Sequence, residues 1–175
     1  MKLLHRFVTI GGFVLGLLSF VATIGFYKFA DAQNPFLYPF RGISNLFGGL
    51  SVAVGVAAVS IWILRKLYVE IKKRKIPDFE LTRAALLFLR KHHILLGWLT
   101  IVTAGAHGIY YMLQYPNQAF RIYTGLVAWI LLVILAGLGA FLNYKLRDKQ
   151  KSKTTRLYHI VFAIFFLAGM VIHTL

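Results

Sequence analysis

The sequence predicts an all-α fold, an integral membrane helical bundle of five transmembrane helices that forms a single domain over residues 1–175. Three observations support this prediction. Hydrophobic residues make up 59% of the chain, and the mean hydropathy is +0.71. Five apolar runs are long enough to cross a bilayer, and basic residues gather in two of the segments between them. A water-soluble domain of this size could not bury so much apolar surface.

Each of the five apolar runs approaches or exceeds the roughly 20 residues that a transmembrane helix needs. They occupy residues 7–29, 43–64, 92–113, 122–144 and 157–175. The first run shares features with a signal peptide, because Lys2 and Arg6 precede it and Ala30–Ala32 (ADA) is similar to a cleavage site. Its apolar stretch is longer than a usual signal core, so we expect a retained helix.

The charged residues divide by loop. The chain has 20 Lys and Arg residues but only 5 Asp and Glu residues. Most basic residues lie at 65–91 and 145–156, two segments on the same side of a five-span chain. The positive-inside rule therefore predicts a cytoplasmic N-terminus and an external C-terminus, in a bacterial or archaeal cell membrane. Anionic lipids are the expected partners of these segments. Nucleic acid is not, because the basic residues are split between loops and lack a recognition motif.

Four of the six histidines repeat at one spacing. His93 precedes His107 by 14 residues, and His159 precedes His173 by the same number. Fourteen residues of an α-helix turn through about 1400°, close to a whole number of turns, and rise about 21 Å. Each pair therefore shares one helix face, near opposite sides of the membrane. Because the third and fifth spans cross in the same direction, we expect His93 level with His159 and His107 level with His173.

This arrangement predicts two haem b groups held between the third and fifth spans. Haem iron takes an axial ligand on each face, and neutral imidazole is a good one. We therefore expect a haem-binding four-helix core with the ligand pairs His93–His159 and His107–His173. Two such haems would carry electrons from one side of the membrane to the other. A single ion cannot join all four residues, since about 21 Å separates the two levels.

Other roles for these histidines remain open. A histidine in a membrane span is often a packed polar residue bonded to a neighbouring backbone. Proton relay is a further alternative, although no Asp or Glu lies inside a predicted span to extend it. The absence of cysteine excludes iron–sulfur clusters and thiolate ligands. His92 competes with His93, but it lies about 60° off the face of His107. We therefore choose His93 and expect His92 to face headgroups or bond a propionate.

Basic residues near the ends of the spans are candidate partners for haem propionates, with headgroup contact as the alternative. They are Arg90, Lys91 and Arg156 on the cytoplasmic side and Arg121 on the external side, with Arg41 and Lys28 nearby. Small residues in the two histidine-bearing spans would let a porphyrin approach the backbone, or would serve ordinary helix packing. They are Gly97, Gly105, Gly108 and Gly169.

Two segments carry a family resemblance: "HHILLGWLTIVTAGAHG" at 92–108 and "YHIVFAIFFLAGMVIHTL" at Tyr158–Leu175. They resemble the haem helices of the ferric-reductase-like transmembrane domain, found in NADPH oxidases, ferric reductases and the haem subunit of the bacterial methionine sulfoxide reductase system. The resemblance covers residues 43–175 and implies that the four paired histidines are the haem ligands. The family's sixth helix and its flavin and NAD(P)H modules have no counterpart here, so we do not expect this chain alone to oxidise NAD(P)H. Other two-haem cytochromes, including quinol-oxidising membrane anchors, also place paired histidines on helices.

The expected function is that of a b-type cytochrome, the electron-transfer subunit of an oxidoreductase. A cytoplasmic flavoprotein or a quinol would donate electrons, with quinone as a candidate further cofactor, and an external or periplasmic acceptor would receive them. Other membrane subunits are candidate partners. Two alternatives stand beside this one. The first is a stand-alone reductase of ferric iron, oxygen or quinone, and the second is a small transporter or assembly protein with structural histidines.

Overall fold

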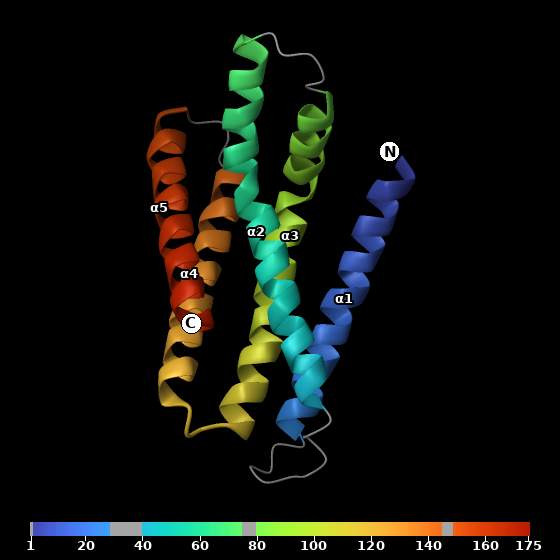
Figure 1. Ribbon diagram of the computed structural model, residues 1–175, viewed down its shortest axis with the longest axis vertical. Coiled ribbons are helices and arrows are strands. Elements are labelled where there is room, and N and C mark those ends of the chain that lie inside the picture. The colour runs from blue at the N-terminus through green and yellow to red at the C-terminus, as the bar shows by residue number, and fades with distance from the viewer. Residues whose placement is uncertain (1, 29–39, 75–79, 145–148) are drawn as a thin grey trace.

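The computed structural model describes residues 2–28, 40–74, 80–144 and 149–175 and is helical almost throughout them (Figure 1). The helices are α1 (Lys2–Lys28), α2 (Arg41–Lys73), α3 (Glu80–Gln114), α4 (Ala119–Tyr144) and α5 (Lys149–Thr174). All five are long and apolar enough to cross a membrane, which confirms the predicted number of spans. The ADA tripeptide and part of each basic loop lie outside the described residues.

The helices α2 and α3 are longer than the apolar runs that predicted them. They contain 33 and 35 residues, or about 50 Å each, whereas the hydrocarbon core of a bilayer is about 30 Å thick. Most of the predicted loop at 65–91 is therefore helical, and α2 projects beyond the other helices in Figure 1. Exposed ion pairs of Glu70 with Arg74 and of Glu80 with Arg83 lie in these extensions. Hydropathy missed the extensions because it detects only the part of a helix that suits lipid.

The packing of the helices places α3 at the centre. It packs against α1, α2 and α4, while α5 packs against α4. The helices α3 and α5 run in the same direction, as Figure 1 shows, but they are not a closely packed pair within the described parts of the chain. Four helices, α2 to α5, thus form a bundle in which α3 and α5 stand apart, and α1 lies outside against α3.

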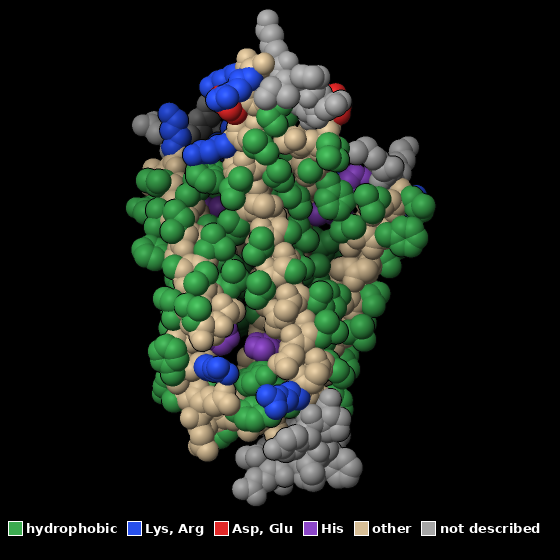
Figure 2. Space-filling model, viewed as in Figure 1, with side chains coloured by type: hydrophobic (Ala, Val, Ile, Leu, Met, Phe, Trp, Pro, Cys, Tyr) green, Lys and Arg blue, Asp and Glu red, His purple; other side chains and the backbone are tan. Residues whose placement is uncertain are grey.

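The outer surface is apolar, and a small core fills the middle of the bundle. Ile101, Leu132, Leu135 and Phe166 form a buried cluster at this level. Phe13 and Leu17, by contrast, keep more than half of their surface exposed. Figure 2 shows hydrophobic side chains covering the length of the molecule, with Lys and Arg side chains near its two ends. Such a distribution suits a chain whose solvent is lipid.

Candidate functional site

Two pairs of histidines face each other between α3 and α5. The ring centroids of His93 and His159 are 6.1 Å apart, with the ring planes at 70°. The centroids of His107 and His173 are 6.4 Å apart, with the planes at 83°. Figure 2 shows histidine side chains at two levels of the molecule. The two pairs are those expected from the sequence spacing, and their role as metal ligands stays a prediction.

Hydrogen bonds orient the two rings of the lower pair, which consists of His107 and His173. Nδ1 of His107 lies 2.9 Å from the backbone carbonyl oxygen of Ser44 on α2 and 3.5 Å from the Ser44 hydroxyl. Since a carbonyl can only accept, Nδ1 of His107 carries the proton. Nε2 then keeps its lone pair, which is the form of imidazole that binds a metal.

His173 has an equivalent arrangement on α4. Its Nδ1 lies 3.2 Å from the hydroxyl oxygen of Thr124, and the Arg121 carbonyl also faces the ring. The Thr124 hydroxyl donates its own proton to the Phe120 carbonyl at 3.0 Å. Its oxygen is therefore the acceptor for Nδ1–H of His173, and Nε2 is again left with a lone pair.

The upper pair consists of His93 and His159, and its rings have fewer hydrogen bonds than those of the lower pair. The carbonyl of Ala58 on α2 faces His93, and the carbonyl of Leu135 on α4 faces His159. Neither contact meets ordinary hydrogen-bond geometry, so the buried Nδ1 atoms of both rings lack a partner. Ser44 and Ala58 are 14 residues apart, as are Arg121 and Leu135. The histidine spacing is thus matched by carbonyl groups on both neighbouring helices.

Glycines on α2 and α4 make room for the rings. A Cβ at Gly48 would come within 2.7 Å of Nδ1 of His107, and a Cβ at Gly125 within 2.9 Å of Cε1 of His173. Gly139 has a similar contact with Cε1 of His159, at 3.2 Å. Gly125 and Gly139 repeat at 14 residues, a signal in the sequence that could have found them.

The glycines singled out from the sequence have other surroundings. A Cβ at Gly105 would meet Nε1 of Trp129 at 3.4 Å, and one at Gly169 would meet Ala128 at 3.6 Å. These two glycines therefore serve helix packing, the alternative considered for them. A Cβ at Gly97 or Gly108 would meet no atom within 4 Å.

A packed layer separates the two histidine pairs. Phe166 lies seven residues from both His159 and His173, and Thr100 is likewise halfway between His93 and His107. Both middle residues are buried, with 5% and 2% of their surface exposed. Gly55 of α2 lies against both of them, because its Cβ would be 3.3 Å from Thr100 and 3.7 Å from Phe166.

Two arginines flank the lower pair. The Tyr111 ring lies 4.8 Å from the His107 ring, centroid to centroid. The hydroxyl of Tyr111 donates to Asn45 at 2.6 Å, and the Arg41 side chain lies close to the same hydroxyl. Arg121 lies close to His173 on the other side. The predicted role of Arg121 toward a propionate stays a prediction, and Arg41 reaches the site through Tyr111.

At the upper pair, Arg90 precedes His93 by three residues and Arg156 precedes His159 by the same offset. Each arginine is thus almost one turn of its helix from the ligand candidate. Both side chains are exposed, and neither has an ion pair with an acidic side chain in the described ranges. Their predicted role as propionate partners stays a prediction, as does the same role for Lys91, which lines a pocket beside α1.

His92 turns away from the upper pair and contacts α1. It is 4% exposed, and its Nε2 lies 2.7 Å from Nδ1 of His5. Phe88 packs against both rings, with centroids 5.7 Å from His5 and 4.8 Å from His92. A headgroup-facing position for His92 is therefore wrong. The sequence offered no partner for His5, because contact between α1 and α3 depends on tertiary packing.

The chemistry open to these residues is that of two separate two-histidine sites. Within the described residues, no group of three or more His, Cys, Asp or Glu side chains could hold one metal ion. Comparisons with protein-family models, curated proteins and solved structures found no match to this chain. The class that the fold defines is therefore an all-helical protein with five helices long and apolar enough to cross a membrane, and the two histidine pairs carry any more specific assignment.

Proposed function

We propose that this chain is a b-type membrane cytochrome that carries electrons across the bilayer through two bis-histidine haems, as a subunit of a redox system. The observation that carries the proposal is the facing of His93 with His159 and of His107 with His173, at centroid distances of 6.1 and 6.4 Å. Two pairs at nearly the same separation, 14 residues apart on both helices, favour one repeated function over four independent structural roles.

The separation suits one metal ion between two imidazoles. A bond of about 2 Å from the ion to each nitrogen, and about 1 Å from that nitrogen to its ring centre, would place the centroids about 6 Å apart. The looser packing of α3 against α5 is also consistent with a flat group between them. The ring centroids of His5 and His92, which are joined by a direct hydrogen bond, are closer together, at 4.9 Å.

The neighbouring helices support this role because they fix the ring orientation. In ligating histidines the second ring nitrogen usually donates to a carbonyl or carboxylate, which sets the tautomer. The Ser44 carbonyl and the Thr124 hydroxyl accept from His107 and His173 in this way. Haem iron held by these residues would supply reversible one-electron chemistry. Arg90 and Arg156 would hold propionates at one level, and Arg121 at the other.

The distribution of charge supports an orientation of the chain, and the proposed route of the electrons is built on that orientation. The basic ends of α2 and α3 would face the cytoplasm, where a flavoprotein or the quinol pool would supply electrons. The His107–His173 end would face outward, toward an external acceptor. Membership of the ferric-reductase-like family is part of the same proposal and rests on the two helix motifs.

The haem content of the purified full chain tests the proposal. We expect reduced-minus-oxidised bands of haem b and two haems per chain in a pyridine-haem count. His107→Ala or His173→Ala should leave one haem, because each change removes a ligand from one level only. His92→Ala is the matched control and should leave two. Missing haem b bands, or an unchanged count in His107→Ala, would contradict the proposal.

A further inference from the structure

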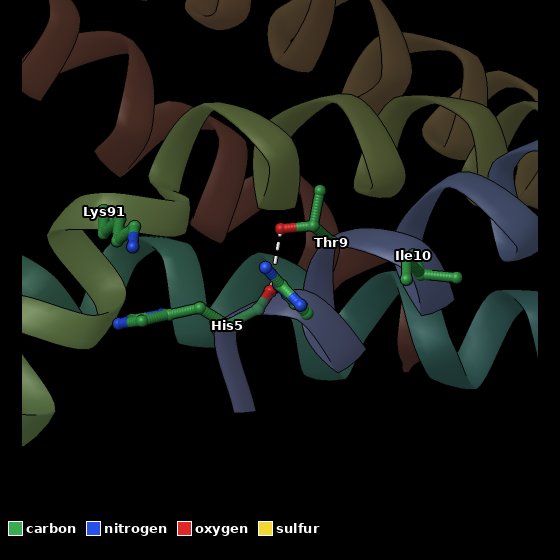
Figure 3. A pocket seen from close by; sticks show the side chains of 5 residues that line it. His5, Thr9, Ile10 and Lys91 are labelled. Atoms are coloured by element: carbon green, nitrogen blue, oxygen red, sulfur yellow. Dashed lines mark hydrogen bonds between the residues drawn. The ribbon is translucent and has the colours of Figure 1, made fainter. Parts of the chain in front are cut away.

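Outside the histidine pairs, the molecule has an open pocket of about 400 Å³ between α1 and α3. Its lining, drawn in Figure 3, consists of His5, Arg6, Thr9, Ile10 and Lys91. We propose that this pocket binds the phosphate group of an anionic membrane phospholipid. The proposal requires that the chain lies in a membrane, but it does not depend on haem.

The charges of the pocket favour an anion. Arg6 and Lys91 bring two positive charges to it, and no acidic residue lines it. Within the described residues, neither cation has an ion pair with Asp or Glu, because the acidic partners found there belong to Arg74 and Arg83. Lys91 also lies close enough for its charge to act on His5. Guanidinium and ammonium groups are the usual partners of phosphate oxygens.

The ring of His5 adds an uncharged hydrogen-bond donor for an anion in the pocket. The Thr9 hydroxyl donates to the His5 carbonyl at 2.9 Å, as the dashed line in Figure 3 shows, so it forms a wall of the pocket. Nδ1 of His5 is bonded to Nε2 of the buried His92. If His92 donates in this bond, Nε2 of His5 carries a proton that an anion can accept. An anion in the pocket selects that tautomer.

The position of the pocket favours a lipid as the source of the phosphate. It lies at the same end of the molecule as the N-terminus of α1 and the basic ends of α2 and α3 (Figure 1). Ile10 and Phe13 follow Arg6 by four and seven residues, and Ile94 follows Lys91 by three, so they lie on the same helix faces as the cations. Each of the three exposes half or more of its surface. A headgroup beside Arg6 and Lys91 would thus leave its acyl chains against apolar side chains. Basic pockets between transmembrane helices are known to recognise anionic headgroups in this way.

Native mass spectrometry of the detergent-purified full chain tests the proposal. Phosphatidylglycerol and phosphatidylcholine are added separately, and the retained lipid is counted. We expect one phosphatidylglycerol to remain bound and phosphatidylcholine to be lost. Arg6→Ala with Lys91→Ala should weaken retention about tenfold, since each cation contributes to headgroup attraction. Equal retention of both lipids would overturn the proposal.

Two controls separate the pocket from general charge. Lys72→Ala with Lys73→Ala removes the same charge from the same end of the molecule, and should keep the lipid. An equal loss in both double variants would overturn the proposal. Arg6→Lys keeps the positive charge and should therefore retain the lipid. Circular dichroism checks that every variant stays helical. Inorganic phosphate is added as a competitor of the lipid. If phosphate remains bound to the chain and displaces phosphatidylglycerol, the pocket belongs to a free anion and the lipid proposal is refuted.

Discussion

The imidazole of His107 lies directly over Gly48 of the neighbouring helix. A Cβ at position 48 would come within 2.7 Å of Nδ1 and 2.8 Å of Cε1 of that ring. Four residues before Gly48, the carbonyl of Ser44 accepts the hydrogen bond from the same ring. The helix α2 thus supplies both the space and the acceptor. On α4, Gly125 provides the same space for His173, and Thr124 beside it provides the acceptor.

Gly48→Val should displace His107. Its side chain would overlap the ring, and the ring cannot move without losing the Ser44 carbonyl, so we expect the haem count to fall from two to one. Gly49→Val is the matched control, because a Cβ at Gly49 meets nothing within 4 Å. The pyridine-haem assay measures both variants. Two haems in Gly48→Val would show that the close contact does not matter for binding.

Thr124→Val should raise the midpoint potential of one haem. The Thr124 oxygen accepts from Nδ1 of His173, which would make the ring a better electron donor and would stabilise ferric iron in a haem held there. Loss of one such hydrogen bond is expected to shift the potential upward by about 20–40 mV. A spectroelectrochemical titration resolves the two haems. Ser51→Ala, which removes a hydroxyl bonded within its own helix, should change neither potential. A shift of both haems by Thr124→Val would contradict the assignment.

Phe166→Ala should lower stability through the layer between the two histidine pairs. Phe166 is 5% exposed and packs with Ile101, Leu132 and Leu135. Deleting a buried phenylalanine ring costs about 3–5 kcal/mol in well-packed protein cores. We expect a lower thermal midpoint of the helical signal. Phe165→Ala is the control, since that side chain is 58% exposed and should have a small effect. Similar midpoints for both variants would contradict the layer's structural role.

His92→Leu should weaken the docking of α1 without removing haem. The change removes the hydrogen bond of 2.7 Å between Nδ1 of His5 and Nε2 of His92, which joins α1 to α3. We expect faster proteolysis near α1 and two haems per chain. Ile94→Leu, on an exposed face of the same helix, should leave proteolysis unchanged. A count of one haem in His92→Leu would mean that His92, and not His93, is the ligand.

Several features were accessible from the sequence because they are local. The length of an apolar run reports the part of a helix that lipid can surround, so five spans could be predicted and are observed. The helical period places His93 with His107, and His159 with His173, on one face of each span. The ends of α2 and α3 were missed, since charged helical turns beyond the bilayer have no hydropathy signal.

The glycines that contact the histidine rings could be predicted from the sequence only in part. Gly125 and Gly139 carry the same 14-residue interval as the histidines, and this repeat could have been read from the sequence. On α2 the repeat is broken, because Trp62 stands 14 residues after Gly48 and its ring lies under the Lys66 ammonium at 3.8 Å. A spacing search alone would therefore have found half of the pattern.

The sequence by itself determined the number of spans, the distribution of charge and the interval between histidines, since each depends on neighbours along one chain segment. The tertiary structure decided that α2 and α4 present Ser44 and Thr124 to the histidines, and that His92 binds His5. Those contacts join residues between 49 and 87 positions apart. They arise only when particular helix faces meet, which is a property of packing and not of any single helix.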